Sequence, residues 1–496
     1  MYVNLGLMRE YWGRKDIGIP ETSAEPVLYF TRISDLEKNM TSKNSKYIGK
    51  YQSNALLGSG TMGRIYRVTI PVLEKTAALK LFTPSRALIK KVGLTWLREQ
   101  FIHEATVIAN IRHPNVVSIW SLEETANELF YLMEYYCRNL GQLIGESYWA
   151  DRPSRTVSVD KACHYMIQII EGLCRLHEAD IIHRDIKPFN IMLADTGTVK
   201  IVDFGLSKRR GEKQFLGAEK LAIGTPFYSA PEQIDSPETV DQRADLYSAG
   251  VILYRMVTGR LPDKNPALPS ELNAQLDRNC DRFILKAIAP HPDDRFQTAD
   301  AMSEELKAFF VLYENARQKE CFAPDDIFQE EKTAPQIKAT LPIRSESSRI
   351  LAKNARAVFN LDDLHQPAVF AENAFQKISD TTVIDQSTNL IWQQSGSRYP
   401  MMWDQAQRYI QMLSESGFGG YQNWRMPTIN EILSLVNPMH DDDFCMEPVF
   451  SPDQKWLWSS DTRSKKSVWT VDAQMGFVNC SNLFDYNFVK GVCSVK

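Results

Sequence analysis

The chain contains His183-Arg184-Asp185-Ile186-Lys187-Pro188-Phe189-Asn190, and Asp203-Phe204-Gly205 follows thirteen residues after Asn190. Asp185 supplies a carboxylate that can accept a proton from a hydroxyl, and Lys187 places a cation two residues further on. Asn190 and Asp203 add two hard oxygen ligands of the kind that Mg²⁺ prefers. A base, a cation and metal ligands are what phosphoryl transfer requires, so these two stretches predict chemistry on a phosphate group.

A second phosphate-binding pattern lies upstream, in a glycine-rich turn between two apolar strands. The turn runs from Leu57 to Gly63, and the strand after it ends in Lys80. Glycines let the backbone approach a phosphate closely and leave N–H groups free to point at its oxygens. The GxGxxG pattern alone is weak, because dinucleotide-binding turns share it. The helical run from Trp96 to Ile111 carries Glu104, which can pair with Lys80. Taken alone, the two residues are better explained as surface charges, and the glycine loop before them and the stretch His113–Val117 after them favour the pair.

Taken together, these motifs resemble those of the protein kinases over about 265 residues, and most closely those of bacterial eukaryotic-like serine/threonine kinases. The resemblance implies a two-lobed kinase fold, ATP as the nucleotide, and Mg²⁺, with Mn²⁺ as an alternative, as the metal. It implies Asp185 as the base and Asn190 and Asp203 as metal ligands. Lys187 implies transfer to serine or threonine of protein substrates. The further residues implied at the nucleotide site are Leu57, Gly58, Ser59, Gly60, Gly63, Ile65, Ala78, Lys80, Glu104, Met133, Glu134, Tyr136 and Met192.

The strand Leu129–Tyr136 resembles the one that enters the hinge between kinase lobes. The resemblance makes Met133 the gatekeeper and pairs the backbone of Glu134–Tyr136 with adenine. The apolar side chains of Ile65, Ala78 and Met192 would sandwich the adenine ring. Ile65 and Ala78 can at the same time be residues of the hydrophobic core.

Three further segments resemble supporting parts of a kinase. Gly224–Tyr228 resembles the peptide-docking segment, in which Thr225 would bridge Asp185 and Lys187. The other two implied roles concern a structural ion pair and a backbone anchor. They are a Glu232–Arg295 bridge and the anchoring of the catalytic-loop backbone by Asp245.

The activation segment departs from the usual kinase pattern, because residues 208–224 contain no Ser, Thr or Tyr. Glu219 occupies the place where related kinases carry a regulatory threonine. We hypothesise that its carboxylate replaces a phosphate and pairs with Arg184. A solvated loop charge is an equal alternative.

Length and composition set the wider frame. A chain of 496 residues predicts two or three domains, and 44% apolar content is that of globular protein. The net charge of −4 argues against a general nucleic-acid binder. We see no apolar run long enough to span a membrane, no signal-peptide core and no paired cysteine motif, so we expect a cytoplasmic protein. The predicted organisation is an extension over 1–46, a kinase domain over 47–314, a linker over 315–375 with one helix around 348–359, and a second domain over 376–496.

The second domain holds six of the ten tryptophans. Its order TVxDxxTxLxWxQ, WxxAxxY, GxxxWRxPTxxEL and WSS resembles the Lcl C-terminal domain family. That resemblance implies a C-type-lectin-like or formylglycine-generating-enzyme-like fold, so the predicted class is α+β multidomain. Trp392, Trp403 and Trp424 are expected in the core. Arg425 and Glu431 are expected to join a loop to a helix.

The leading hypothesis is therefore a cytoplasmic serine/threonine kinase whose C-terminal domain binds a ligand or recruits a target. The segment 476–488 is dense in Asn, Asp, Ser and Tyr, which suits an adaptable recognition surface, although an ordinary polar strand pair explains it as well. The alternative is a ligand-binding protein, fixed or diversified by a retroelement, in which the kinase domain is mainly a scaffold. Membrane and nucleic-acid partners are not expected, and a homodimer is left open.

Overall fold

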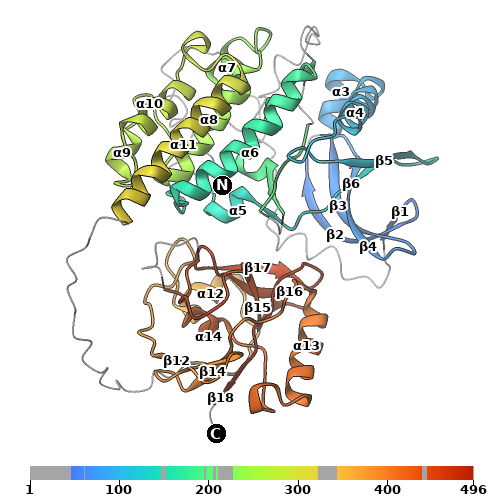
Figure 1. The fold of residues 1–496 in the computed structure, drawn as a ribbon. Coiled ribbons are helices and arrows are strands. Elements are labelled where there is room, and N and C mark those ends of the chain that lie inside the picture. The colour runs from blue at the N-terminus through green and yellow to red at the C-terminus, as the bar shows by residue number, and fades with distance from the viewer. Residues whose placement is uncertain are drawn as a thin grey trace. The chain divides into compact units, whose positions relative to one another are not determined.

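A computed structural model describes residues 46–60, 62–146, 152–194, 197–204, 208–209, 227–321, 343–437 and 444–494. The chain divides into two compact units, 1–321 and 322–496, and each is described by itself (Figure 1). Some sequence predictions fall outside the described residues. They concern Thr225, Glu219 and nearly all of the extension over 1–46.

The first unit opens with a six-stranded antiparallel sheet in the order β1-β2-β3-β4-β6-β5. Its strands are β1 (Lys46–Ile48), β2 (Tyr51–Ser59), β3 (Gly63–Ile70), β4 (Lys75–Phe82), β5 (Ile119–Glu124) and β6 (Leu129–Met133). The register places Ile65 opposite Lys80, and Ala78 opposite Met133. Residues predicted to surround the nucleotide therefore lie on neighbouring strands.

Helices α3 (Arg86–Val92) and α4 (Leu94–Ala109) belong to the same part of the chain (Figure 1). The buried positions of α4 follow the helical repeat and include Phe101, Glu104 and Ile108. Glu104 thus lies on the apolar face of α4, where an unpaired carboxylate would be strongly destabilising.

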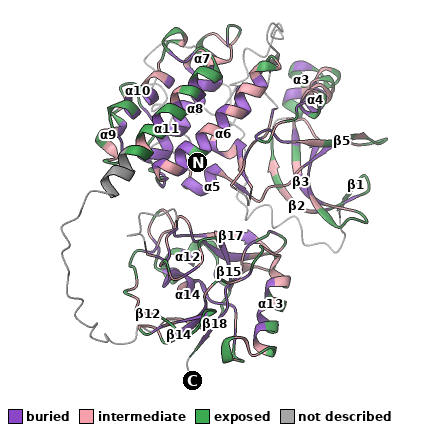
Figure 2. Cartoon of the chain, viewed as in Figure 1, coloured by how far each residue is buried: buried purple, intermediate pink, exposed green. Residues whose placement is uncertain are grey.

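The rest of the first unit is mainly helical, and its core lies along α6 and α8 (Figure 2). Its helices are α5 (Leu140–Ile144), α6 (Val159–Glu178), α7 (Pro231–Asp235), α8 (Arg243–Thr258), α9 (Pro269–Leu272), α10 (Arg278–Ala287) and α11 (Ala299–Cys321). Short strands form the sheets β10-β9-β7 and β11-β8. They are β7 (Arg138–Asn139), β8 (Ile181–Ile182), β9 (Ile191–Leu193), β10 (Val199–Ile201) and β11 (Lys208–Arg209). The catalytic stretch connects β8 to β9, and Asp203 follows β10.

In its described residues, the second unit combines two antiparallel sheets with three α-helices and one short 3-10 helix, Phe418–Gly420. The sheets have the orders β12-β13-β14-β18 and β15-β16-β17. The strands are β12 (Phe375–Lys377), β13 (Thr382–Asp385), β14 (Leu390–Gln393), β15 (Trp456–Ser464), β16 (Ser467–Asp472), β17 (Phe477–Asn482) and β18 (Val492–Ser494). The α-helices are α12 (Ala352–Phe359), α13 (Trp403–Glu415) and α14 (Ile429–Leu433). None of the helices in the described parts of the chain is long and apolar enough to cross a bilayer.

The boundary between the units differs from the predicted linker over 315–375. Helix α11 continues to Cys321, and residues from 343 onward pack into the second unit. Ile350 and Phe359 lie in its core, and the predicted helix is present as α12. This segment joins the unit through isolated bridges such as Arg349 to Thr462, so it leaves no strand period in the sequence.

The aromatic and polar residues expected to build the second unit take mostly the expected places. Trp392 and Trp424 are buried, whereas Trp403 is only half-buried and donates its indole N–H to the Ser459 carbonyl at 3.2 Å. Two Arg425 nitrogens contact the two Glu431 carboxylate oxygens at 2.7 and 2.5 Å. This bidentate pair joins the loop before α14 to the helix itself.

Candidate active site

The backbone of the catalytic stretch is held by Asp245, a fully buried carboxylate near the start of α8. The amides of His183 and Arg184 donate to its two oxygens at 2.9 and 2.8 Å. Arg184 has φ 67°, a left-handed conformation that strains a non-glycine residue. The carboxylate therefore fixes a backbone turn that would not persist unaided, in the anchoring position predicted for Asp245.

Asp185 is buried beside two of the residues predicted to act with it. Lys187 Nζ donates to Asp185 Oδ2 at 2.7 Å, and Asn190 Nδ2 donates to the same oxygen at 3.0 Å and to the Asp185 carbonyl at 2.8 Å. Burial raises the pKa of Asp185, and the Lys187 ammonium opposes that shift. Among the residues that the structure describes, both side-chain contacts fall on Oδ2, so Oδ1 can accept a hydrogen bond from a hydroxyl.

Asp203 approaches the same region from the end of β10 with φ 64°. Lys80 Nζ lies 3.1 Å from its Oδ1, and the side chain is 40% exposed. The Lys80 ammonium lowers the pKa of Asp203 to about 2, more than burial raises it. Its carboxylate is thus ionised and open. Asn190 uses its nitrogen to hold Asp185, so its Oδ1 can join Asp203 as a hard ligand, and this pair fits Mg²⁺.

Lys80 is buried between two carboxylates. Its Nζ lies 2.8 Å from Glu104 Oε1, so the expected ion pair is present. Burial lowers the pKa of Lys80, but the charges of Glu104 and other neighbours outweigh it and hold the pKa well above its usual value. Tyr131 of β6 also donates its hydroxyl to Glu104 Oε1, at 2.9 Å.

The glycine-rich hairpin between β2 and β3 meets two different requirements. A Cβ at Gly63 would lie 2.5 Å from the Leu81 carbonyl oxygen, so close strand packing demands glycine there. A Cβ at Gly58 would meet nothing within 4 Å, which leaves open space beside the backbone. The Gly60 amide donates to the Gly63 carbonyl at 2.8 Å and closes the hairpin. Open space beside Gly58 is what a phosphate needs.

Only some of the residues predicted to bind adenine contact one another in the structure. Ala78 and Met133 are paired and buried, and Met192 lies on β9 in the other part of the unit. Glu134 engages Tyr136, whose hydroxyl donates to Glu134 Oε2 at 2.6 Å. Burial and this contact raise the pKa of Tyr136. The pairing of the Glu134–Tyr136 backbone with adenine stays a prediction.

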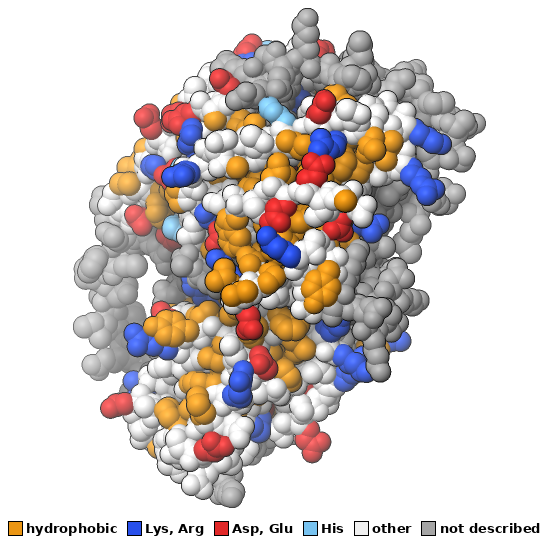
Figure 3. Space-filling view, turned by 90° about the vertical axis from the view of Figure 1, so that its right-hand side faces the viewer, with side chains coloured by type: hydrophobic (Ala, Val, Ile, Leu, Met, Phe, Trp, Pro, Cys, Tyr) orange, Lys and Arg blue, Asp and Glu red, His pale blue; other side chains and the backbone are white. Residues whose placement is uncertain are grey.

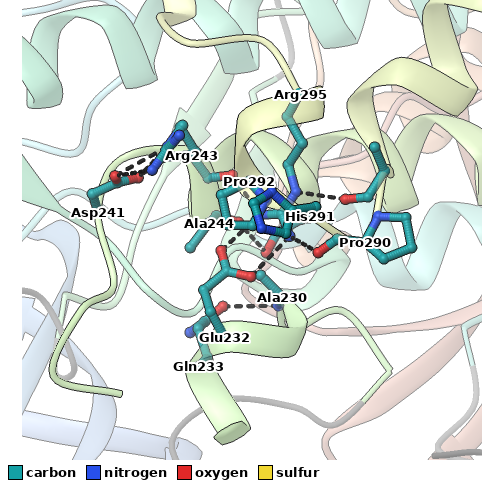
Figure 4. Close-up of polar contacts among 12 residues, drawn as sticks. Ala230, Glu232, Gln233, Asp241, Arg243, Ala244, Pro290, His291, Pro292 and Arg295 are labelled. Carbon is teal, nitrogen blue, oxygen red and sulfur yellow. Dashed lines mark hydrogen bonds and ion pairs between the residues drawn. The ribbon is translucent and has the colours of Figure 1, made fainter. Parts of the chain in front are cut away.

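Two buried ion pairs support the segment before α8. Arg295 holds both oxygens of Glu232 at 2.6 and 2.8 Å, as predicted, and also donates to the carbonyls of Ala289 and Pro290 (Figure 4).

The second pair was not predicted. Arg255 contacts both oxygens of Glu146 at 3.2 Å, and Glu146 accepts a hydrogen bond from the hydroxyl of Tyr228. Tyr228 ends the predicted docking segment. This cluster therefore ties Tyr228 to α8.

Sequence reasoning missed Tyr131, Glu146 and Arg255. Tyr131 occupies an otherwise apolar strand, and Glu146 and Arg255 are 109 residues apart, so neither spacing nor a motif marks them.

Residues 51–330 match the protein kinase domain family, and residues 381–493 match the Lcl C-terminal domain family. The chain is 32% identical over 321 residues to a probable serine/threonine-protein kinase of Corynebacterium efficiens, and the matched region covers 59% of this chain and 46% of that protein. It is 32% identical over 278 residues to the serine/threonine-protein kinase PksC of Streptomyces coelicolor, covering 52% and 48%. With PrkC of Bacillus subtilis the identity is 28% over 276 residues, covering 53% and 41%. The chain thus spans about half the length of these curated relatives.

Proposed function

The chain belongs to the protein kinase family, and we propose that it transfers the γ-phosphate of ATP to serine or threonine hydroxyls of protein substrates. The observation that carries the proposal is the paired arrangement of two carboxylates. Asp185 contacts Lys187 at 2.7 Å, and Asp203 contacts Lys80 at 3.1 Å. One carboxylate serves the acceptor hydroxyl and the other serves the metal-bound nucleotide.

In the proposed reaction, Asp185 Oδ1 orients the acceptor hydroxyl and takes its proton. The hydroxyl oxygen forms a bond to the γ-phosphorus while the bond to the β–γ bridging oxygen breaks and ADP departs. Lys80 holds the phosphates, and Lys187 stabilises negative charge on the transferred group. Mg²⁺, held by Asn190 and Asp203, would neutralise charge on the phosphate oxygens.

A γ-phosphate transfer assay with Mg²⁺, repeated with Mn²⁺, and a generic protein acceptor tests this function. Asp185→Asn should lower the rate by about 10²–10⁴-fold, because it removes the base but not the fold. Asp263→Asn is a suitable control, since that aspartate is exposed and outside the site. If neither wild type nor Asp185→Asn transferred phosphate, the proposal would be overturned and the scaffold alternative favoured.

For the C-terminal unit we propose a recognition role in a lectin-like domain. An open pocket of about 330 Å³ lies between the segment 347–349, the start of α13 and strand β15. Its walls provide one guanidinium, one indole, one amide and several hydroxyls. They belong to Ser347, Ser348, Arg349, Trp403, Gln407, Met426, Ser460 and Thr462. Binding screens on residues 343–496, compared with Trp403→Ala, test this role; hits that ignore the substitution would contradict it.

The net charge of −4 gives no support to a general nucleic-acid partner. On the face drawn in Figure 3, acidic and basic side chains are interspersed instead of gathered by sign. The cytoplasmic location stays a prediction, and whether the protein forms a homodimer stays open.

A further inference from the structure

The carboxylate of Glu104 receives two hydrogen bonds on one oxygen. Oε1 accepts from Lys80 Nζ at 2.8 Å and from the Tyr131 hydroxyl at 2.9 Å. Oε2 is buried and has no hydrogen-bond partner among the residues that the structure describes. The orientation of this carboxylate therefore depends on two donors, of which only Lys80 is expected from the sequence.

Tyr131 is unusual in its strand, since β6 reads Leu-Phe-Tyr-Leu-Met and all of its residues are buried. A phenol in such a strand is unfavourable unless its hydroxyl is hydrogen-bonded. The register places Tyr131 opposite Lys80, and its ring lies 5.2 Å from the ring of Phe101 on α4. The side chain therefore contacts the strand that carries the lysine and the helix that carries the glutamate.

Lys80 divides its contacts between Glu104 and Asp203, which lies 3.1 Å away. Under the proposed function, Asp203 turns to the metal-bound nucleotide, and Glu104 becomes the main protein anchor of the ammonium. An anchor with a bare Oε2 can rotate unless a second donor holds Oε1. Burial and the Glu104 charge hold the pKa of Tyr131 well above its usual value, so the phenol stays a donor at working pH.

We propose that Tyr131 is a positioning residue for phosphoryl transfer, whose hydroxyl fixes Glu104, and through it helix α4, so that Lys80 points at the nucleotide. This inference rests on the proposed function. It predicts that the hydroxyl matters for the transfer step more than for the docking of the protein substrate.

Tyr131→Phe tests the proposal because it keeps the ring and its contact with Phe101 and removes only the hydroxyl. We expect kcat to fall about tenfold, the effect of losing one hydrogen bond to a charged group, with an unchanged KM for the protein acceptor. The matched control is Tyr51→Phe. Tyr51 is buried in the same sheet and its hydroxyl contacts Glu123 at 2.5 Å, away from Lys80. That control should leave kcat unchanged within twofold.

A double-mutant cycle separates positioning from general packing. With Glu104 replaced by Gln, Tyr131→Phe should lower kcat by less than twofold further. In the full chain, amide hydrogen exchange in α4 should be several-fold faster in Tyr131→Phe than in wild type. Unchanged kcat together with unchanged α4 exchange would overturn the inference. If wild type and Asp185→Asn were equally silent, the proposed function would fail, and α4 exchange alone would decide whether Tyr131 holds the helix.

Discussion

The two units of the chain each bury a lysine amine, and the two amines differ in whether they contact a carboxylate. Lys80 lies against the carboxylates of Glu104 and Asp203, and its pKa is held well above the usual value. Lys490 donates to the carbonyls of Gln393 and Gln394 at 3.1 and 2.6 Å and lies 4.9 Å from the ring of Phe450, and burial lowers its pKa to about 7. Both side chains are buried, so burial alone does not explain the difference between their pKa values. Lys80 has carboxylate partners that favour the charged form, whereas the shift of Lys490 comes from burial.

The same contrast separates catalysis from architecture. Lys80 contacts Asp203, whose side chain is 40% exposed, so under the proposed function these charges can reach a bound phosphate. In the second unit, the buried carboxylate of Asp461 is satisfied internally: Arg344 contacts it at 2.7 and 2.5 Å, and the amides of Ser348 and Ile429 donate to it. Arg344 and Ser348 come from the segment expected to be a linker.

Removing that segment should produce the largest effect. Residues 343–496 should unfold in one cooperative transition, whereas 376–496 should show none. The shorter fragment loses Ile350 and Phe359 from the core and leaves Asp461 without its cation, and the summed loss rivals the ~5–15 kcal/mol stability of a domain. Thermal and urea unfolding followed by tryptophan fluorescence and circular dichroism measures this.

A single substitution isolates the ion pair within that segment. Arg344→Met in residues 343–496 should lower the free energy of unfolding by about 3 kcal/mol, because it strands a buried carboxylate. Arg349→Met changes an exposed arginine of the same segment and should have little effect. Equal stability of the two fragments, or of the two variants, would show that the segment is a linker after all.

The next largest effect concerns the lysine that has carboxylate partners. Lys80→Met should lower the transfer rate by about 10²–10³-fold, since it removes a charge placed against the phosphates. Lys75→Met, on the exposed start of the same strand, should retain activity. The transfer assay decides, with circular dichroism as a check on folding. Activity within threefold of wild type would mean that the buried ammonium at position 80 is structural, as at position 490.

The predictable part of the molecule is the part in which chemistry demands a local pattern. Asp185, Lys187 and Asn190 lie within one loop, so their spacing alone announces their proximity. The Glu232–Arg295 bridge could be predicted because each residue belongs to a recognisable motif. Arg344 and Asp461, 117 residues apart, belong to none.

The rest of the fold leaves weaker signals. Strands of three or four residues, such as β12 and β18, are too short to show an alternating pattern, so the order of the strands in the sheet β12-β13-β14-β18 could not be predicted from the sequence. Tyr131 gives no signal because an aromatic residue in an apolar strand is explained by packing alone. Its partner becomes visible only when β6 and α4 are placed together.

A smaller effect should appear in the pH dependence of the second unit. The pKa of Lys490 is about 7 in the folded state, whereas an amine in the unfolded chain titrates near ~10.4. Between these values the unfolded state binds more protons, so the free energy of unfolding should rise with pH, by at most about 1.4 kcal/mol per pH unit. Below pH 7 both states are protonated and this dependence ends.

Urea unfolding of residues 343–496 between pH 6 and 9 measures the slope. Lys490→Met should abolish the rise, while Lys465→Met, which changes an exposed lysine, should keep it. A flat profile in wild type would mean that the carbonyls and the Phe450 ring hold the charge as well as carboxylates do, and the contrast with Lys80 would disappear.

The smallest effect concerns the activation segment. Because residues 208–224 contain no Ser, Thr or Tyr, loop phosphorylation within them is excluded, and Glu219 is the candidate partner of Arg184. A carboxylate carries one negative charge where a phosphate carries nearly two, so the contact should be weak but permanent. Glu219→Ala should therefore lower the transfer rate several-fold, and Glu219→Asp by less. Phosphatase treatment of the wild-type enzyme should leave the rate unchanged, whereas full inactivation by phosphatase would place the switch on a phosphorylated residue elsewhere and remove Glu219 from it.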